Sequence, residues 1–214
     1  MTADRTTSVA WMAEGTRLMT DDIVALDERG YDRPSGLPGW SRRHLVAHVA
    51  SNAEALGRLL TWALTGQPRP MYASSEQRAA DIETGALLDA ARLTEWFIRS
   101  ADDLAHAVGE LPTDAWDAKV TTAMGRTVPA SDIPWMRSRE VMVHAVDLVA
   151  STTFAELPGD FLAALRGDIV ERRGSALPLD ADGDPDQVTA WLAGRPHVGV
   201  TINGHPAPDL PAWL

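Results

Sequence analysis

Four long segments of the chain carry apolar residues at helical spacing, and loops rich in proline and glycine separate them. The periodic segments cover about residues 7–28, 41–64, 86–108 and 132–151. Apolar positions that recur every three or four residues line one face of a helix. Helices of this length bury their apolar faces against one another, so the pattern predicts a four-helix bundle with any functional site between facing helices.

Residue types at the segment boundaries agree with this assignment. Ser41 is a suitable N-cap for the second helix, and Pro134 falls in the first turn of the fourth. Gly66, followed by a proline two residues later, is expected to end the second helix. A short helix is expected through Ile82, whereas residues 112–129 are expected to form a loop.

Beyond Pro158 the predicted elements become shorter. Residues 161–173 and 187–193 predict two helices, and an acidic turn lies between them at 180–186. Residues 197–202 alternate between apolar and polar like a strand, followed by a turn at Asn203-Gly204.

We therefore predict a mainly α protein with two domains. A four-helix bundle covers residues 1–155, and a small α/β C-terminal domain covers residues 156–214. The chain of 214 residues is long enough for both, and a hydrophobic content of 45% is typical of a globular protein with a substantial core.

Charge and composition exclude several classes of function. The net charge of −11 disfavours nucleic-acid binding, which depends on excess lysine and arginine. The first residues do not predict a signal peptide, and no apolar stretch reaches the roughly 20 residues that span a bilayer. We expect a monomeric cytoplasmic protein without a membrane partner. The absence of cysteine excludes disulfides, thiolate ligands and a cysteine nucleophile.

A candidate metal site lies on the second and fourth predicted helices. Glu140 and His144 are four residues apart, so their side chains project next to each other. The second helix offers His44 and His48 at the same spacing, and spacing alone does not choose between them. Two histidines and one carboxylate form the ligand set of a catalytic zinc with an open fourth position.

The fourth helix also allows a simpler interpretation. Arg137, Glu140, His144 and Asp147 form one polar stripe on a helix that is otherwise apolar. Such a stripe can be the solvated face of an amphipathic helix. If the helix is buried, the same stripe becomes an internal polar group that needs partners.

Three segments resemble the mycothiol-dependent maleylpyruvate isomerases, zinc enzymes with a DinB-like four-helix bundle. The first runs from Leu-Pro-Gly-Trp-Ser-Arg at residues 37–42 to His48. The second combines Thr-Gly at 65–66 with Pro-Met-Tyr at 70–72, and the third runs from Gly125 to Leu148. The likeness covers nearly all of the first 155 residues.

The resemblance implies a ligand set and a reaction. The zinc ligands of the family fall on His48, Glu140 and His144, and an arginine needed for activity falls on Arg195. The family isomerises maleylpyruvate, a dicarboxylate of gentisate degradation, to fumarylpyruvate. Zinc-bound mycothiol would add to the double bond as a thiolate, the bond would rotate, and the thiolate would leave. Arg195 would hold a substrate carboxylate or developing oxyanion. Separately, Asp147 lies one turn beyond His144, a position that suits a residue orienting a ligand imidazole and equally a surface residue near the helix end.

Two other functions are compatible with these residues. A mycothiol S-transferase acting on other electrophiles would keep the same zinc ligands. Members of the family usually have more strand sequence where this chain has only residues 177–186. A reduced sheet could change the substrate pocket, which is compatible with an S-transferase. A non-catalytic metal-binding module would have a closed fourth coordination position, which the three-ligand set disfavours.

Overall fold

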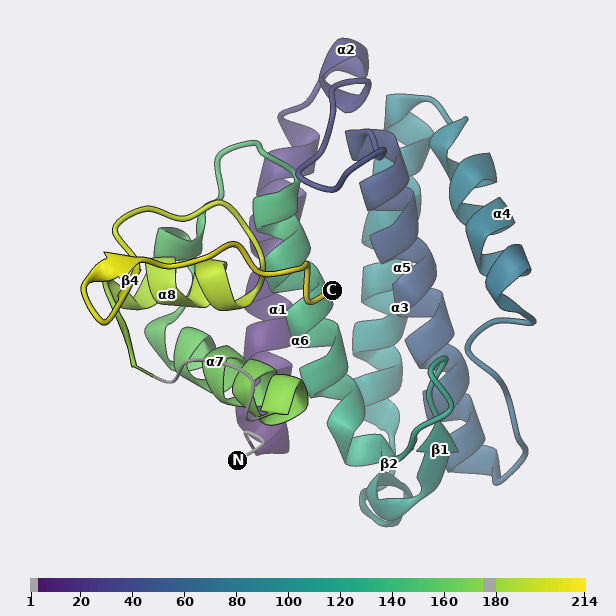
Figure 1. Cartoon of the computed structure of the whole chain (residues 1–214). Helices are drawn as coiled ribbons and strands as arrows, with labels where there is room; N and C mark the ends of the chain where they lie inside the picture. Colours follow the sequence, from purple (N-terminus) through teal and green to yellow (C-terminus); the bar gives the residue numbers. More distant parts are fainter. Residues whose placement is uncertain (1–3, 175–179) are drawn as a thin grey trace.

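Four long helices form the bundle that the sequence predicts. A computed structural model describes residues 4–174 and 180–214 of the chain. The bundle contains α1 (Arg5–Val24), α3 (Arg42–Thr65), α5 (Ala90–Glu110) and α6 (Ile133–Asp147). In Figure 1, α1 lies beside α6 and α3 lies beside α5, while α6 also contacts α3. A shorter helix, α4 (Ser75–Ala86), packs on the outside of α3.

Local capping explains several helix boundaries. Asp4 precedes α1, and its side chain accepts a hydrogen bond from the backbone N–H of Thr7 at 3.0 Å. Asp89 caps α5 in the same way. The predicted end of α3 is confirmed at Gly66, where φ is +68°, a left-handed conformation that glycine adopts at little cost.

Two predicted helices are longer than the observed ones. The first ends at Val24, and a separate short helix, α2 (Glu28–Tyr31), follows it. The fourth ends at Asp147 instead of residue 151. Arg42 explains the second difference: its Nε donates to the carbonyl of Leu148 at 2.7 Å, and its Nη2 donates to the carbonyl of Val149. These bonds satisfy carbonyls at the end of the helix, so the chain turns away.

The predicted loop at 112–129 contains an antiparallel hairpin, so this prediction was wrong in part. Strands β1 (Lys119–Thr121) and β2 (Thr127–Pro129) pair with Val120 opposite Val128. Both valines are buried against the end of the bundle. Strands of three residues are too short to give an alternating pattern, which is why the sequence did not show them. The 3-10 helices η1 (Thr113–Asp117) and η2 (Ala130–Asp132) flank the hairpin.

In the C-terminal part the two predicted helices are confirmed, whereas the observed strand is shorter than the predicted one. After the 3-10 helix η3 (Phe154–Glu156) come α7 (Gly159–Arg173) and α8 (Pro185–Leu192). The small antiparallel sheet has the order β3 (Ala181–Asp182), β4 (Thr201–Ile202) and β5 (His205–Pro206). The turn at Asn203-Gly204 is confirmed, with φ of +52° and +78°. Of the predicted strand at 197–202, only the last two residues form a ladder; residues 177–179 of the stretch before it lie outside the described part.

The C-terminal elements share a hydrophobic core with α1 and α6. Trp11 of α1, Trp135 of α6 and Phe161 of α7 meet with ring centroids 5.7–5.8 Å apart. Trp191 of α8 belongs to the same buried cluster. In Figure 1, α7 and α8 accordingly lie on the α1–α6 side of the bundle. The boundary at residue 155 stays a prediction.

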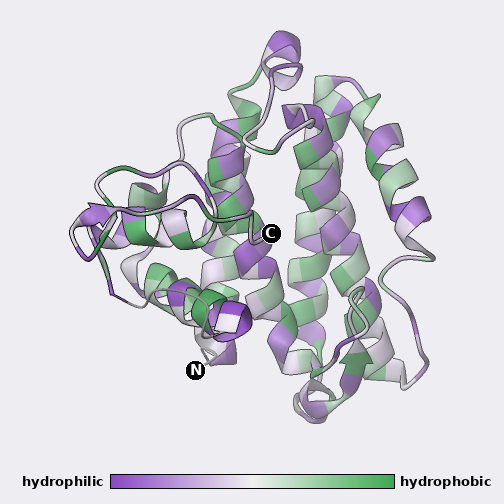
Figure 2. Cartoon of the chain, viewed as in Figure 1, coloured by the Kyte–Doolittle hydropathy of each residue, from purple (hydrophilic) through white to green (hydrophobic). Residues whose placement is uncertain are grey.

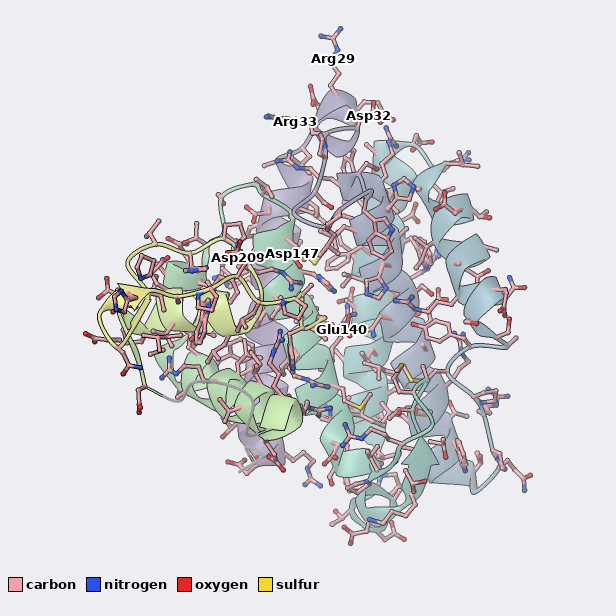
Figure 3. The ribbon with its side chains drawn as sticks, viewed as in Figure 1. Arg29, Asp32, Arg33, Glu140, Asp147 and Asp209 are labelled. Atoms are coloured by element: carbon pink, nitrogen blue, oxygen red, sulfur yellow. The ribbon has the colours of Figure 1, made fainter. Side chains whose placement is uncertain are left out.

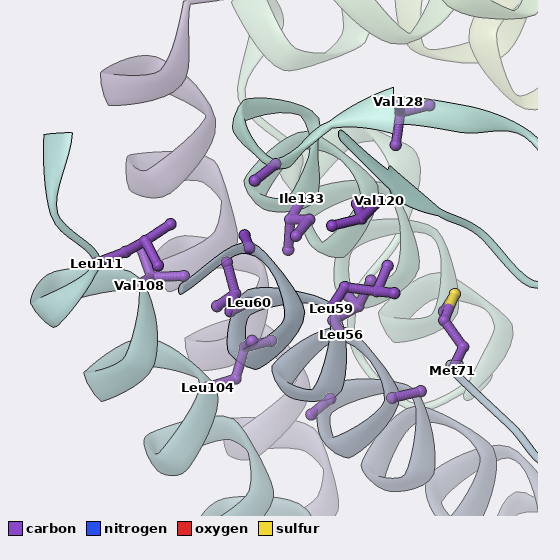
Figure 4. Close-up of a cluster of buried hydrophobic side chains, with 14 of the residues drawn as sticks. Leu56, Leu59, Leu60, Met71, Leu104, Val108, Leu111, Val120, Val128 and Ile133 are labelled. Atoms are coloured by element: carbon purple, nitrogen blue, oxygen red, sulfur yellow. The ribbon is translucent and has the colours of Figure 1, made fainter. Parts of the chain in front are cut away.

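A second cluster fills the end of the bundle next to the hairpin. Figure 4 shows leucines of α3 and α5 meeting the hairpin valines and Ile133. Along the bundle helices, Figure 2 shows hydrophobic and hydrophilic residues mixed, as expected for helices with a buried and an exposed face. Within the described residues, no helix has the length and hydropathy needed to cross a membrane.

Candidate metal centre

Three of the four residues in the polar stripe of α6 are buried, and the fourth, Glu140, is half-buried. Arg137 is 0% exposed, His144 2% and Asp147 3%. Figure 3 shows Glu140 and Asp147 along α6, with α3 and α5 on one side of this helix and the C-terminal elements on the other. The helix is therefore not an amphipathic surface helix, and each polar side chain on it needs a partner inside the protein.

Helix α3 brings His48 to Glu140 and His144. The Nε2 atom of His48 lies 3.2 Å from Oε2 of Glu140, and Nε2 of His144 lies 3.5 Å from the same oxygen. One potential ligand atom from each residue lies within 4.8 Å of the others. The three residues that the resemblance assigns to zinc thus converge from two facing helices.

His44 lies outside this group, although it precedes His48 by one helical turn. Its Nδ1 is 2.7 Å from Oγ of Ser41, and its Nε2 is 3.4 Å from a carboxylate oxygen of Glu83. The His44 side chain is 25% exposed, against 7% for His48. The ring contacts the start of α3 and Glu83, and it is not part of the group of candidate ligands.

The charges of the three residues fit a cation held between them. Burial lowers the pKa of His48 and leaves its imidazole neutral at pH 7, despite the opposing effect of Glu140. Burial alone would raise the pKa of Glu140, but hydrogen bonds from His144 and His48 hold it well below its usual value. Burial disfavours charge on His144, yet Asp147 and Glu140 outweigh it and raise the pKa to about 9.

A proton on His144 therefore supplies the positive charge that the Glu140 carboxylate requires. A divalent ion in contact with both imidazoles would replace that proton. Two neutral nitrogen donors and one carboxylate oxygen suit zinc, and no cysteine is needed. The donor set of this site fits a catalytic zinc.

Arg78, which lies beside His48, and Arg58, which lies beside Tyr72, were not predicted from the sequence. Nη2 of Arg78 lies 3.2 Å from Nδ1 of His48. The guanidinium carbons of Arg58 and Arg78 lie 6.0 and 5.7 Å from the ring centroid of Tyr72. Within the described ranges, neither arginine forms an ion pair with a carboxylate. Tyr72 belongs to a motif that the sequence singled out, but nothing in the sequence marks the arginines.

Arg137 fixes α6 against α3 beside Glu140. Its Nη1 donates to the carbonyl of Val49 at 2.7 Å and to Oδ1 of Asn52 at 2.9 Å. Its Nη2 is buried without a hydrogen-bond partner among the described residues. Complete burial lowers the pKa of Arg137 to about 10, and the nearby Glu140 carboxylate opposes this shift. Arg137 is therefore a buried cation that supports the Glu140 side of the site.

Arg195 reaches the site through Asp147. Its Nε and Nη2 donate to Oδ1 and Oδ2 of Asp147, each at 2.8 Å. Asp147 in turn lies 2.9 Å from Nδ1 of His144, the contact expected of a residue that orients a ligand imidazole. The predicted role of Arg195 in holding substrate stays a prediction, and these contacts do not favour it.

The remaining histidines do not join the metal centre. His106 and His205 are exposed, and the half-buried His197 lies with Nδ1 3.2 Å from the carbonyl of Arg195.

Comparisons with known proteins show which family the chain resembles. A family profile described as the mycothiol maleylpyruvate isomerase N-terminal domain matches residues 12–149. The crystal structure of a mycothiol-dependent maleylpyruvate isomerase superposes with a TM-score of 0.93 and 35% sequence identity, over 100% of both chains. The crystal structure of a histidine-to-alanine mutant of a mycothiol-dependent maleylpyruvate isomerase superposes with a TM-score of 0.92 and 34% sequence identity, also over 100% of both chains. No curated protein sequence matches the chain significantly.

Proposed function

The chain belongs to the mycothiol maleylpyruvate isomerase family, and on that premise we propose that it isomerises maleylpyruvate to fumarylpyruvate with zinc and mycothiol. The observation that carries the proposal is the convergence of His48, Glu140 and His144 between α3 and α6. These residues would bind the zinc. A cytoplasmic location, a monomeric state and a place in gentisate degradation belong to the same proposal.

The cis-to-trans conversion requires a temporary single bond, because a carbon–carbon double bond does not rotate at useful rates. Addition and later elimination of a thiolate provides that bond. The chain contains no cysteine, so the thiol has to come from outside the protein. Bound zinc would lower the pKa of the mycothiol thiol and so make thiolate available at neutral pH.

The surrounding residues support this chemistry electrostatically. Glu140 contributes a negative charge that partly neutralises the metal, and burial of His48 and His144 limits access of water. A cation held by Nε2 of His48 would require the ring proton to be on Nδ1. Arg78, which has only N–H donors, would then lose Nδ1 as an acceptor and could bind an anion instead.

We expect Arg78 to bind a carboxylate of the substrate. The protein has a net charge of −11, so a dicarboxylate needs local cations at the site. Arg78→Gln should lower kcat/KM for maleylpyruvate by about 10- to 100-fold, the loss of one hydrogen bond to a charged group. Arg99→Gln, an exposed arginine on α5, is the matched control and should behave as wild type. A wild-type kcat/KM for Arg78→Gln at normal zinc content would remove Arg78 from substrate binding.

The proposed reaction is distinguished from an S-transferase by the fate of the thiol. With maleylpyruvate, mycothiol and zinc-loaded protein, we expect fumarylpyruvate to accumulate while the concentration of free thiol stays constant. Stoichiometric consumption of thiol, with a stable conjugate as the product, would instead identify an S-transferase on the same scaffold. The measurement combines product detection by absorbance with a thiol titration of the same sample.

A further inference from the structure

Arg195 uses three of its five N–H donors within the protein. Nε and Nη2 donate to both oxygens of Asp147, and Nη1 donates to the carbonyl of Ala193 at 2.7 Å. The residue is only 6% exposed. All three guanidinium nitrogens are thus engaged by the protein itself, in the planar two-pronged geometry that arginine forms with a carboxylate.

Asp147, which Arg195 holds in place, also contacts His144, a residue of the candidate metal centre. The Oδ2 atom that accepts from Arg195 also lies 2.9 Å from Nδ1 of His144. His144 then presents Nε2 toward Glu140. The three residues form a chain of contacts that runs from the C-terminal elements to one candidate ligand. An acceptor at Nδ1 fixes both the tautomer and the orientation of an imidazole that binds metal through Nε2.

Backbone contacts hold both Arg195 and Asp147 in place. Gly194 has φ of +67°, and a Cβ at this position would overlap the carbonyl group of Pro211. The N–H of Trp213 donates to the carbonyl of Ala193 at 3.1 Å. The carbonyl of Asp147 accepts from the N–H of Gly36 at 2.6 Å. Arg195 therefore lies on a turn whose position depends on Pro211 and Trp213.

We infer that Arg195 is a positioning residue that acts through Asp147 on His144, and that docking of the C-terminal elements thereby raises the affinity of the bundle for zinc. The inference rests on the proposed zinc site. Asp147 is 3% exposed, and a buried carboxylate keeps its place only when it is paired. Without Arg195 its contact with His144 loses that support.

The inference predicts a specific pattern of zinc affinities. Zinc binding is measured by competition with a chromophoric chelator, without mycothiol or substrate. Arg195→Gln and Asp147→Asn should each weaken zinc binding by about 10- to 100-fold, the usual effect of losing a group that orients a metal ligand. The double variant should bind zinc no more weakly than the weaker single variant, because both changes break the same chain of contacts.

Arg139→Gln is the matched control. Arg139 also joins α6 to the C-terminal elements, through an ion pair of 2.8 Å with Asp168 of α7. Its guanidinium, although next in sequence to Glu140, forms no hydrogen bond or ion pair with the three candidate ligands in the described structure. Arg139→Gln should lower the melting temperature while leaving zinc affinity at the wild-type level. In the Arg195 and Asp147 variants, the rise in melting temperature on zinc addition should also be smaller than in wild type.

Three outcomes would overturn the inference. Wild-type zinc affinity in Arg195→Gln, with a loss only in kcat/KM, would place Arg195 on the substrate. Additive losses in the double variant would show that Arg195 and Asp147 act separately. Failure of the wild-type protein to bind zinc would refute the proposed metal centre itself, and the inference with it. If Arg195→Gln does not fold, Asp147→Asn still tests the chain of contacts, because it keeps the shape of Asp147 but replaces one acceptor oxygen by an NH2 group that faces N–H donors.

Discussion

Replacing His144 by alanine is expected to remove bound zinc and isomerase activity together. His144 is 2% exposed, and its Nε2 is one of three donor atoms that converge on the site. The substitution leaves one imidazole and one carboxylate, too few for a stable catalytic zinc. Metal catalysis contributes several kcal/mol, so turnover should fall on the order of a thousandfold or more. Zinc content by mass spectrometry and the rate with maleylpyruvate and mycothiol are measured on the same preparation.

His44→Ala is the control for this experiment. His44 lies one turn before His48 on α3, but its ring contacts Ser41 and Glu83. Its removal should leave zinc content and turnover near the wild-type values. Stoichiometric zinc in purified His144→Ala protein would refute the ligand assignment.

Omission of mycothiol is expected to abolish turnover completely. The chain has no cysteine, so the protein has no thiol of its own that could add to the double bond and leave again. Dialysed, zinc-loaded protein should not isomerise maleylpyruvate until mycothiol is added, and glutathione should replace it poorly. The rate is followed before and after addition of each thiol. A comparable rate without any thiol would exclude the addition–elimination mechanism.

The sequence predicted the bundle and the candidate ligands on α6 because both depend on short-range patterns. Apolar spacing over four long segments is a strong signal for helices, and Pro134 marks the first turn of α6. Glu140 and His144 are adjacent on any helix that contains them. His44 and His48 share one face of α3, so spacing could not separate them. The hydrogen bond of His44 to Ser41 is what separates them in the structure.

The features that the sequence did not reveal depend on contacts between distant residues. Helix α6 ends early because Arg42 binds the carbonyl of Leu148, 106 residues away. Arg195 and Asp147 are 48 residues apart and meet only because the C-terminal elements fold onto the bundle. Arg78 comes next to His48 through the packing of α4 on α3. Periodicity within one helix carries no information about such pairs.

X-ray absorption at the zinc edge, with and without mycothiol, tests the central claim most directly. The zinc-loaded protein should show nitrogen and oxygen ligands at about 2.0–2.2 Å, with an imidazole signature, and addition of mycothiol should introduce one sulfur at about 2.3 Å. The same sample should convert maleylpyruvate to fumarylpyruvate. A zinc that stays without sulfur in a sample that turns over substrate with mycothiol would contradict a thiol activated at this metal centre.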